Sequence, residues 1–238
     1  MGTEGPRTDR LGLLMEQFDQ AREMAEVRLK GLGDEEFLWE PVLGCWSLRR
    51  REEAVTPRAY GPGAWVLDLG APDIPANEYA EIGRQVASGM TVEEIAADWS
   101  VSVARVEEVL AHAGEPEPDA TPVTTIAWRL AHLHSCFAGQ WEWTFGARRE
   151  PRQLIDFTPS ASLALDRFWS TLDRWRESVG AVTEEQLDTV GFSQYPYGSD
   201  PHDPYVSVVW GSNLELVHHM AEIALLRDLW RVRGELGR

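Results

Sequence analysis

The stretch "SNLELVHHMAEIALLRDLWRVR", residues 212–233, decides the fold that this sequence predicts. Its apolar residues recur at spacings of three and four, the pattern of an amphipathic α-helix. Ser212 and Glu215 have the spacing of a capping box, so we expect the helix to begin there. The apolar side chains cover two sides of the helix, and such a helix is expected to be deeply buried. One side carries Leu216, Met220, Ile223, Leu226 and Trp230, and the other carries Leu214, Ala221, Leu225 and Leu229.

Three earlier segments show the same helical periodicity. They run over about residues 8–30, 123–143 and 160–179. A short acidic segment follows the first ("LGDEEFLWEP", 32–41) and another follows the third ("VTEEQLDTVG", 182–191), so the chain reads as two similar halves. The predicted fold class is therefore all-α, a four-helix bundle with long crossover connections.

The connection between the first and second helices is too long for a simple loop, since it holds about ninety residues. Part of it reads as three short helices followed by a linker. We therefore expect residues 1–74 to form the first part of the bundle, 75–115 a small helical insertion, and 116–238 the remainder of the bundle. A homodimer contact is one use open to the insertion, and no residue pattern singles it out.

The segment "TVEEIAADWSVSVARVEEVL", residues 91–110, has the rhythm of a helix-turn-helix. A DNA-binding face needs basic groups that neutralise phosphates. Residues 76–115 contain two arginines against eight acids, and the helix that would read DNA carries Glu107 and Glu108. The charge thus favours a packing or interaction role for the insertion over DNA binding.

The composition narrows the class of protein further. The chain carries a formal net charge of −17, and such a surface repels nucleic acids and anionic lipid heads, so we expect neither as a partner. No run approaches the roughly 18 apolar residues of a membrane span. The two cysteines, Cys45 and Cys136, lack metal-type spacing, and the N-terminus shows no signal peptide. They are expected to be reduced thiols in a cytoplasmic protein.

A histidine with an acid four residues away can hold a metal from one face of a helix. About two such pairs are expected by chance in so acidic a chain, so spacing alone identifies no site. Three occur, namely Glu108/His112, Glu215/His219 and His218/Glu222. The first lies in the acidic insertion and is expected to be a solvated pair.

The adjacent histidines of the last helix face different surroundings, because neighbouring helix positions point about 100° apart. His218 shares its face with Glu222, on the second apolar side defined above. A carboxylate there needs a cation, a metal or hydrogen-bond donors, since burying it alone costs several kcal/mol. His219 points toward Glu215, which suits a structural or orienting hydrogen bond.

In the predicted second helix, His132 shares a face with small residues that leave space for a ligand cavity. The neighbours on that face are Trp128, Ser135, Cys136, Gly139 and Trp143. The alternative is a core histidine bonded to a carbonyl group. Taken together, His132, His218 and Glu222 offer two imidazoles and a carboxylate, a ligand set that suits Zn²⁺ and also Ni²⁺ or Fe²⁺.

Three segments of the chain resemble the DinB-like superfamily. They are "GLGDEEFLWEPVLGCWSLR" (31–49), "TTIAWRLAHL" (124–133) and "LELVHHMAEIALLRDLW" (214–230). The resemblance covers about residues 8–70 and 116–235, and leaves out the insertion. It implies a four-helix bundle that holds a divalent metal.

The same resemblance implies a ligand set. In the family, one ligand is a His of the second helix and two more are a pair spaced by four on the last helix, which here correspond to His132, His218 and Glu222. Many members have His at the last of these positions, so Glu222 is a departure that bears on the identity of the metal. His219 would orient the site, and Cys136 and Trp128 would line its pocket.

The resemblance also implies an activity. Enzymes among these relatives use a low-molecular-weight thiol, such as mycothiol or bacillithiol, in S-transfer or isomerisation of a small-molecule substrate. A metal with three protein ligands keeps an open position where a thiol loses its proton at neutral pH. The alternative is a non-catalytic metal- or ligand-binding protein of stress response or interaction, in which the same residues are structural or vestigial.

Aromatic residues crowd the segment before the last helix, which the sequence predicts to be a loop. They are Tyr195, Tyr197, Tyr205 and Trp210. Because the next helix carries the expected ligands, we expect this loop to form part of the pocket rim. The alternative is a set of ordinary surface aromatics partly packed on the bundle.

Overall fold

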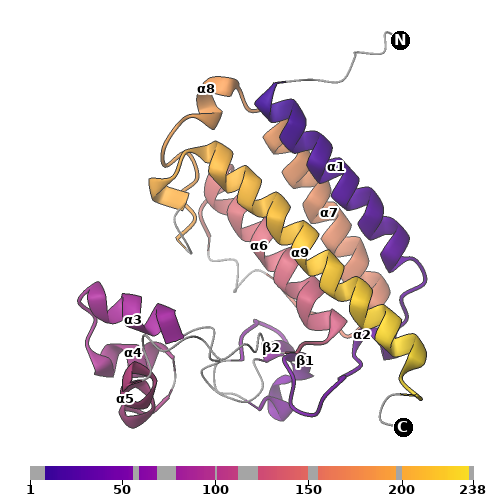
Figure 1. The fold of residues 1–238 in the computed structure, drawn as a ribbon, viewed down its shortest axis with the longest axis vertical. Helices are drawn as coiled ribbons and strands as arrows, with labels where there is room; N and C mark the ends of the chain where they lie inside the picture. The colour runs from indigo at the N-terminus through magenta and orange to yellow at the C-terminus, as the bar shows by residue number, and fades with distance from the viewer. Residues whose placement is uncertain are drawn as a thin grey trace.

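Four long helices form the body of the molecule. The computed structural model describes residues 9–55, 59–68, 79–99, 101–111, 123–149, 155–196 and 200–235. Helices α1 (Arg10–Leu29), α6 (Ile126–Thr144), α7 (Ala161–Gly180) and α9 (Tyr205–Val232) run side by side (Figure 1). α6 packs against α7 and α9, and α1 packs against the same two helices. The predicted all-α fold class is confirmed, and no helix of the described ranges is long and apolar enough to cross a membrane.

Large aromatic side chains fill the core between these helices. Phe137 of α6 meets Phe18 of α1 edge-on, with ring centroids 6.1 Å apart, and meets Trp175 of α7 at 5.6 Å. All three rings are at most 1 % exposed, and burial of each ring contributes roughly 2–3 kcal/mol. The apolar spacing seen in the sequence therefore places one continuous core along α1, α6 and α7.

Local sequence signals set the ends of the long helices. Asp9 caps α1 by accepting a hydrogen bond from the Gly12 amide at 2.6 Å, and Gly31 follows the helix with a φ of +74°, which suits glycine. Thr125 caps α6 in the same way through the Trp128 amide. This cap fixes the start of the helix that carries His132, so it sets where that ring lies.

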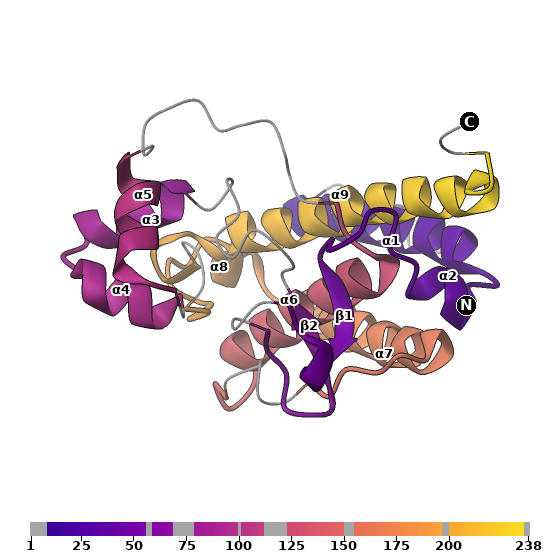
Figure 2. The same ribbon diagram turned by 90° about the horizontal axis from the view of Figure 1, so that it is seen from below.

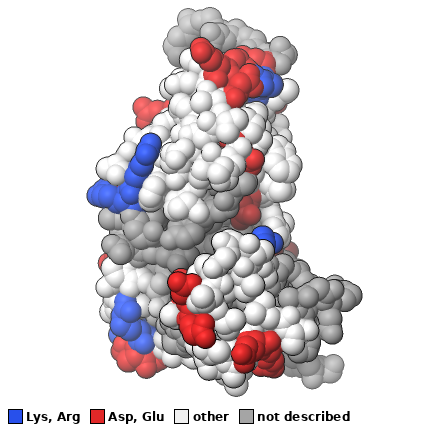
Figure 3. All heavy atoms as spheres, turned by 90° about the vertical axis from the view of Figure 1, so that its left-hand side faces the viewer, with Lys and Arg blue, Asp and Glu red and all other residues white. Residues whose placement is uncertain are grey.

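The insertion forms a small helical unit of its own. It contains α3 (Tyr79–Ala87), α4 (Val92–Asp98) and α5 (Val103–Ala111), the three short helices that the sequence predicts. Ile82, Ile95, Trp99, Val106 and Val109 form a separate apolar cluster, and Figure 2 shows these helices set apart from the long ones. The face visible in Figure 3 carries acidic side chains and few basic ones where the insertion lies. The predicted boundaries near residues 74 and 115 fall outside the described residues.

A two-stranded hairpin packs against α6. Strand β1 (Ser47–Arg50) runs directly into the 3₁₀ turn η1 (Arg51–Glu53), and β1 pairs antiparallel with β2 (Trp65–Asp68), with Ser47 opposite Asp68. This hairpin is not predicted from the sequence, because four-residue strands give almost no alternating pattern. It matters for the site because Trp46, next to β1, packs against Trp128 with ring centroids 4.8 Å apart and the rings tilted at 49°.

Two short helices follow α1 and α7 at equivalent places in the two halves of the chain. They are α2 (Asp34–Phe37) and α8 (Glu184–Leu187), and they coincide with the two acidic segments that suggested a repeat. Another short 3₁₀ turn, η4 (Asp200–His202), precedes α9. Each half therefore contains a long helix followed by a single helical turn, as the faint repeat predicted.

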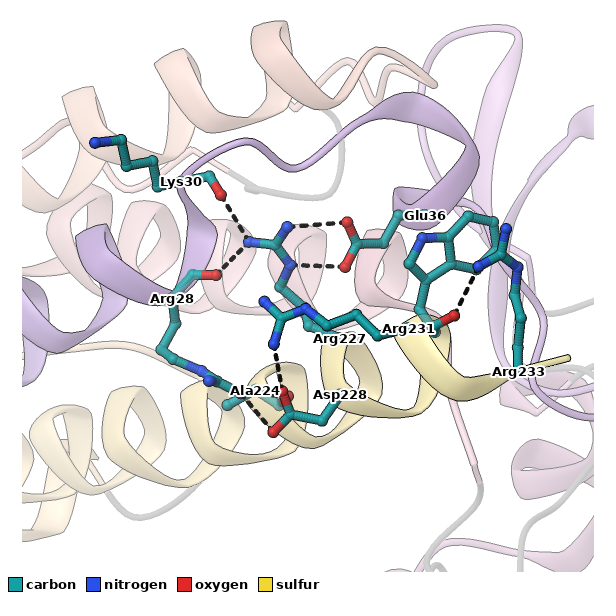
Figure 4. A network of polar contacts seen from close by, with 9 residues as sticks. Arg28, Lys30, Glu36, Ala224, Arg227, Asp228, Arg231 and Arg233 are labelled. Atoms are coloured by element: carbon teal, nitrogen blue, oxygen red, sulfur yellow. Dashed lines mark hydrogen bonds and ion pairs between the residues drawn. The ribbon is translucent and has the colours of Figure 1, made fainter. Parts of the chain in front are cut away.

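A buried ion pair joins α2 to α9. Arg227 donates to both carboxylate oxygens of Glu36, from Nε at 2.7 Å and from Nη2 at 2.9 Å (Figure 4). Nη1 of the same guanidinium donates to the carbonyl groups of Arg28 and Lys30 at the end of α1. One side chain thus satisfies exposed carbonyls of α1 and fixes α2 beside α9.

The last helix begins earlier than the sequence analysis predicts. α9 starts at Tyr205, behind Pro204, so the capping box assigned to Ser212 and Glu215 is wrong. Ser212 lies inside the helix, where its hydroxyl bonds to the Val208 carbonyl one turn back. The apolar pattern had in fact continued upstream, since Tyr205 and Val208 are buried.

The deep burial expected of α9 is also wrong for one of its two apolar sides. Leu216 and Ile223 are fully buried, but Leu214 is 50 % exposed and Leu225 is 60 % exposed. Neighbouring helices of a bundle cover only part of each helix, so the second apolar side faces outward. Which side of α9 is covered also determines the surroundings of His218 and His219.

Candidate metal centre

His132 of α6 and His219 of α9 face each other across the contact between the two helices. Their ring centroids lie 4.8 Å apart, and the rings meet edge to face at 89°. The His132 ring stacks on Trp128, one turn earlier on α6, at 5.1 Å and 10°. Trp128 in turn packs on Trp46, so the caps and the hairpin described above hold His132 in place.

Glu215 lies beside both rings. Its Oε2 atom is 3.0 Å from Nε2 of His219 and 3.6 Å from Nε2 of His132. The three ligand atoms all lie within 4.8 Å of one another. Ligands held at about 2.0–2.1 Å around a tetrahedral zinc ion are separated by about 3.3 Å, so this set fits a divalent ion after small shifts.

A second group of possible ligands shares His219. It contains His218, His219 and Glu222, again with one atom of each within 4.8 Å of the others. Oε2 of Glu222 is 2.5 Å from Nδ1 of His219, and Oε1 is 3.7 Å from Nε2 of His218. The His218 side chain is 60 % exposed, whereas that of His219 is 8 % exposed. The two groups therefore share the buried His219: the first adds the partly exposed His132 and Glu215, and the second adds the exposed His218 and the partly exposed Glu222.

The pKa values of two groups respond to this packing. Hydrogen bonds from His132 and His219 lower the pKa of the Glu215 carboxyl far below its usual range, although burial opposes the shift. Burial also disfavours the charged form of His132, but its contacts with Cys136 and Glu215 outweigh burial and raise its pKa to about 10. In the metal-free protein, protons therefore neutralise charge at the place where a divalent ion would do so.

Arg129 supplies a permanent cation next to Glu222. Its Nε atom lies 3.0 Å from Oε2 of Glu222, an ion pair without the alignment of a hydrogen bond, and its side chain is 7 % exposed. Burial works against an ionised Glu222, yet the hydrogen bond from His219 and the charge of Arg129 still lower the pKa of that carboxyl. The sequence predicts that the Glu222 carboxylate needs a cation, a metal or hydrogen-bond donors, and Arg129 is such a cation.

Cys136 lies one turn after His132 on the same face of α6. Its Sγ atom is 3.6 Å from Nε2 and 3.9 Å from Nδ1 of that histidine, so it lies beside the ring and in line with neither lone pair. The thiol is free, as is that of the buried Cys45. Cys136 therefore borders the group formed by His132, Glu215 and His219 without belonging to it.

The structure places the residues selected from the sequence as follows. His132 belongs to the first group, with Glu215 and His219, whereas His218 and Glu222 belong to the second group. Among the described residues, these three do not form one group of mutually close donors. The ligand set His132, His218 and Glu222 therefore stays a prediction. His112 and Tyr197 lie outside the described residues.

Two aromatic residues expected in a loop lie inside α9 instead. Tyr205 is fully buried between Phe145 and Phe192, at 6.2 and 4.8 Å between ring centroids, and Trp210 is 55 % exposed. The helix rise of about 1.5 Å per residue separates Tyr205 from His219 by about 20 Å. Such a separation is too long for Tyr205 to border the group around His219.

Sequence reasoning missed two residues of this region, Glu215 and Arg129. Glu215 was assigned to a helix cap, although its spacing of four from His219 had been noted as a possible metal pair. Arg129 gave no signal, because an arginine in an apolar helix is ordinarily read as a surface residue. Only the approach of α6 to α9 reveals the partners of both.

Searches for similar proteins, both among curated proteins and among solved structures, found no significant match. The family model of the DinB superfamily matches residues 17–223. This span contains α6, most of α9 and all residues of the two groups of possible ligands. With the all-α fold and a His/Glu group that could hold a metal, the match shows that this chain belongs to the DinB superfamily.

Proposed function

We propose that this protein holds a divalent metal ion through His132, Glu215 and His219. The observation that carries the proposal is that one donor atom of each residue lies within 4.8 Å of the others, with Nε2 of both histidines close to Oε2 of Glu215. Two imidazoles and a carboxylate are a common ligand set of catalytic zinc sites, and they also accept Ni²⁺ or Fe²⁺. Zinc is the metal that we expect.

In this proposal Glu222 orients His219 and is not itself a ligand. A carboxylate only accepts hydrogen bonds, so the 2.5 Å contact requires a proton on Nδ1 of His219. Nε2 is then the atom that faces Glu215 and His132. A histidine ligand whose second nitrogen donates to a carboxylate is the usual arrangement in metal sites. The set suggested by family resemblance, with His218 and Glu222 as ligands, is the alternative.

We further propose that the metal serves enzyme chemistry on a small molecule, namely S-transfer or isomerisation with a low-molecular-weight thiol, in the cytoplasm. A metal with three protein ligands keeps an open position at which a thiol is deprotonated at neutral pH. His132 and His219 would each bind the ion through an unprotonated Nε2, and Glu215 would supply negative charge. Trp128 and Cys136 would border the ring of His132 and shape the space beside it.

A non-catalytic protein is the competing class, and one observation favours it. Both carboxylates of the cluster already have partners without a metal, because Glu222 contacts Arg129 and His219 while Glu215 contacts His219 and His132. A binding or interaction protein could keep this network for structure alone. The two classes differ in whether the protein takes up a stoichiometric metal and then consumes a thiol.

The test begins with metal analysis of the purified protein after loading with zinc and desalting. We expect about one ion per chain in the wild type and none in His219→Ala. The loaded protein is then screened for consumption of mycothiol, bacillithiol or another small thiol in the presence of electrophiles. Absence of any bound divalent ion would overturn the proposal, and metal without thiol consumption would favour the non-catalytic class.

A further inference from the structure

Arg129 is a buried cation next to the candidate metal centre. It lies on α6 one turn before His132, and only 6 % of the residue is exposed. A guanidinium remains charged in proteins, and burying it is costly unless a carboxylate compensates it. Its presence beside a proposed site for a divalent cation therefore needs an explanation.

Its contacts point to one partner. Nε is 3.0 Å from Oε2 of Glu222, while Nη1 is 3.4 Å from Nδ1 of His219. Since Nδ1 already carries the proton donated to Glu222, Arg129 cannot donate to it as well. The guanidinium also lies 5.3 Å over the Trp128 ring, and this ring helps fix its position. Arg129 thus pairs directly with Glu222 and reaches His219 only through that carboxylate, while its charge also acts on Glu215.

We infer that Arg129 is a positioning residue of the metal centre, because it holds Glu222 where that carboxylate keeps Nε2 of His219 directed at Glu215 and His132. The inference rests on the proposed function above. The same contact explains why Glu222, although close to His219, serves as an acceptor: its Oε2 atom is shared between Arg129 and Nδ1 of His219.

Simple electrostatics predicts the opposite effect. A guanidinium repels a divalent cation, so removal of Arg129 should tighten metal binding if the residue acted through its charge alone. If it acts by positioning, its removal should weaken binding. The sign of the change in metal affinity therefore separates the two roles, and a purely structural role would change the stability of the fold without either effect.

The experiment measures Zn²⁺ affinity by competition with a chelator, and the absorption spectrum of the Co²⁺-loaded protein, in five variants. They are Arg129→Met, Arg129→Lys, Glu222→Gln, the double variant Arg129→Met/Glu222→Gln, and Arg22→Met as control. Arg22 of α1 is a partly buried arginine paired with Glu26 and Asp173 outside the cluster, so its variant should bind like the wild type.

We expect Arg129→Met and Glu222→Gln each to weaken binding by roughly 10–100-fold, the range found for residues that orient metal ligands. Arg129→Lys should recover part of the loss, because a lysine can still pair with Glu222. The double variant should bind no more weakly than Glu222→Gln, because Arg129 acts through Glu222. Tighter or unchanged binding in Arg129→Met, or additive losses in the double variant, would overturn the inference.

The experiment also remains decisive if one variant does not fold or if the wild type binds no metal. Should Arg129→Met fail to fold, Arg129→Lys in the Glu222→Gln background carries the test: it should bind like Glu222→Gln alone, and a further loss contradicts the inference. A wild-type protein that binds neither Zn²⁺ nor Co²⁺ overturns the proposed function itself. A wild type that binds both, with Arg129→Met equal to it, overturns only the role of Arg129.

Discussion

Nε2 of His219 and Oε2 of Glu215 lie 3.0 Å apart on one face of α9, and His132 of α6 completes that face from the neighbouring helix. His218, the next residue along the chain, is largely exposed. Both histidines contact Glu222, but only His219 also reaches Glu215 and His132, so the two have different roles.

We predict that His219→Ala yields metal-free protein whereas His218→Ala keeps its metal. The reason is that Nε2 of His219 faces Glu215 and His132, while the exposed His218 contacts Glu222 and the ring of His219. Metal content after loading and desalting is the measurement, and the two variants serve as controls for each other. The reverse result would favour the ligand set suggested by family resemblance.

Removal of the metal should leave the bundle folded. Four long helices supply an extensive aromatic and aliphatic core, unlike a zinc finger, whose fold depends on its metal. Far-ultraviolet circular dichroism with and without a chelator should show the same helical content. A loss of helix on chelation would mean that the ion is a structural element of the bundle.

Acid should destabilise the protein partly through His134. Burial, with the nearby charges of Arg167 and Arg174, lowers the pKa of this histidine to about 4, below its ordinary value near 6.5. The unfolded chain therefore binds a proton more readily between these values, so stability is complete above about pH 6.5 and falls as the pH drops toward 4. The loss should amount to about 1–3 kcal/mol, since the side chain is not fully enclosed.

The comparison that isolates His134 uses His134→Gln and the exposed His202→Gln. Urea unfolding at pH 7 and at pH 4.5 gives the free energy of unfolding of each protein. We expect a smaller difference between the two pH values in His134→Gln than in the wild type or in His202→Gln. Equal differences in all three proteins would show that His134 makes no contribution.

Breaking the buried pair of Glu36 and Arg227 should destabilise the fold strongly. Glu36→Leu leaves the Arg227 guanidinium buried without its carboxylate, which costs roughly 3–5 kcal/mol in comparable cases. Glu36→Leu/Arg227→Met should recover much of this loss, because no unpaired charge remains. Asp19→Asn, which breaks an exposed pair with Arg176, should cost much less in the same thermal unfolding assay.

The insertion should not bind DNA. Its described helices carry acids at exposed positions, including Glu93 and Glu107, and such a surface repels phosphates. A gel-shift assay with random duplex DNA at low salt is the measurement. A retarded band that weakens as the salt concentration rises would contradict this prediction.

Much of the fold followed from local patterns in the sequence. The spacing of Leu11, Phe18 and Leu29 predicted α1, and the three helices of the insertion matched their segments. The predicted beginning of α9 at Ser212 is wrong. A serine can cap a helix, but Ser212 lies inside α9, which begins at Tyr205. Local chemistry allows a cap, but whether the helix continues upstream depends on tertiary burial of residues such as Tyr205.

The sequence by itself determined that α9 carries two histidines with acids four residues away, and that α6 carries another histidine. It could not determine which histidine faces inward, because both sides of α9 are apolar and either could have been buried. Packing against α1 and α6 decided the matter: it covers Leu216 and Ile223, leaves Leu214 and Leu225 exposed, and turns His219 toward His132. The spacing of residues along one helix fixes which side chains share a face, but only contact with another helix determines which of those faces is removed from water.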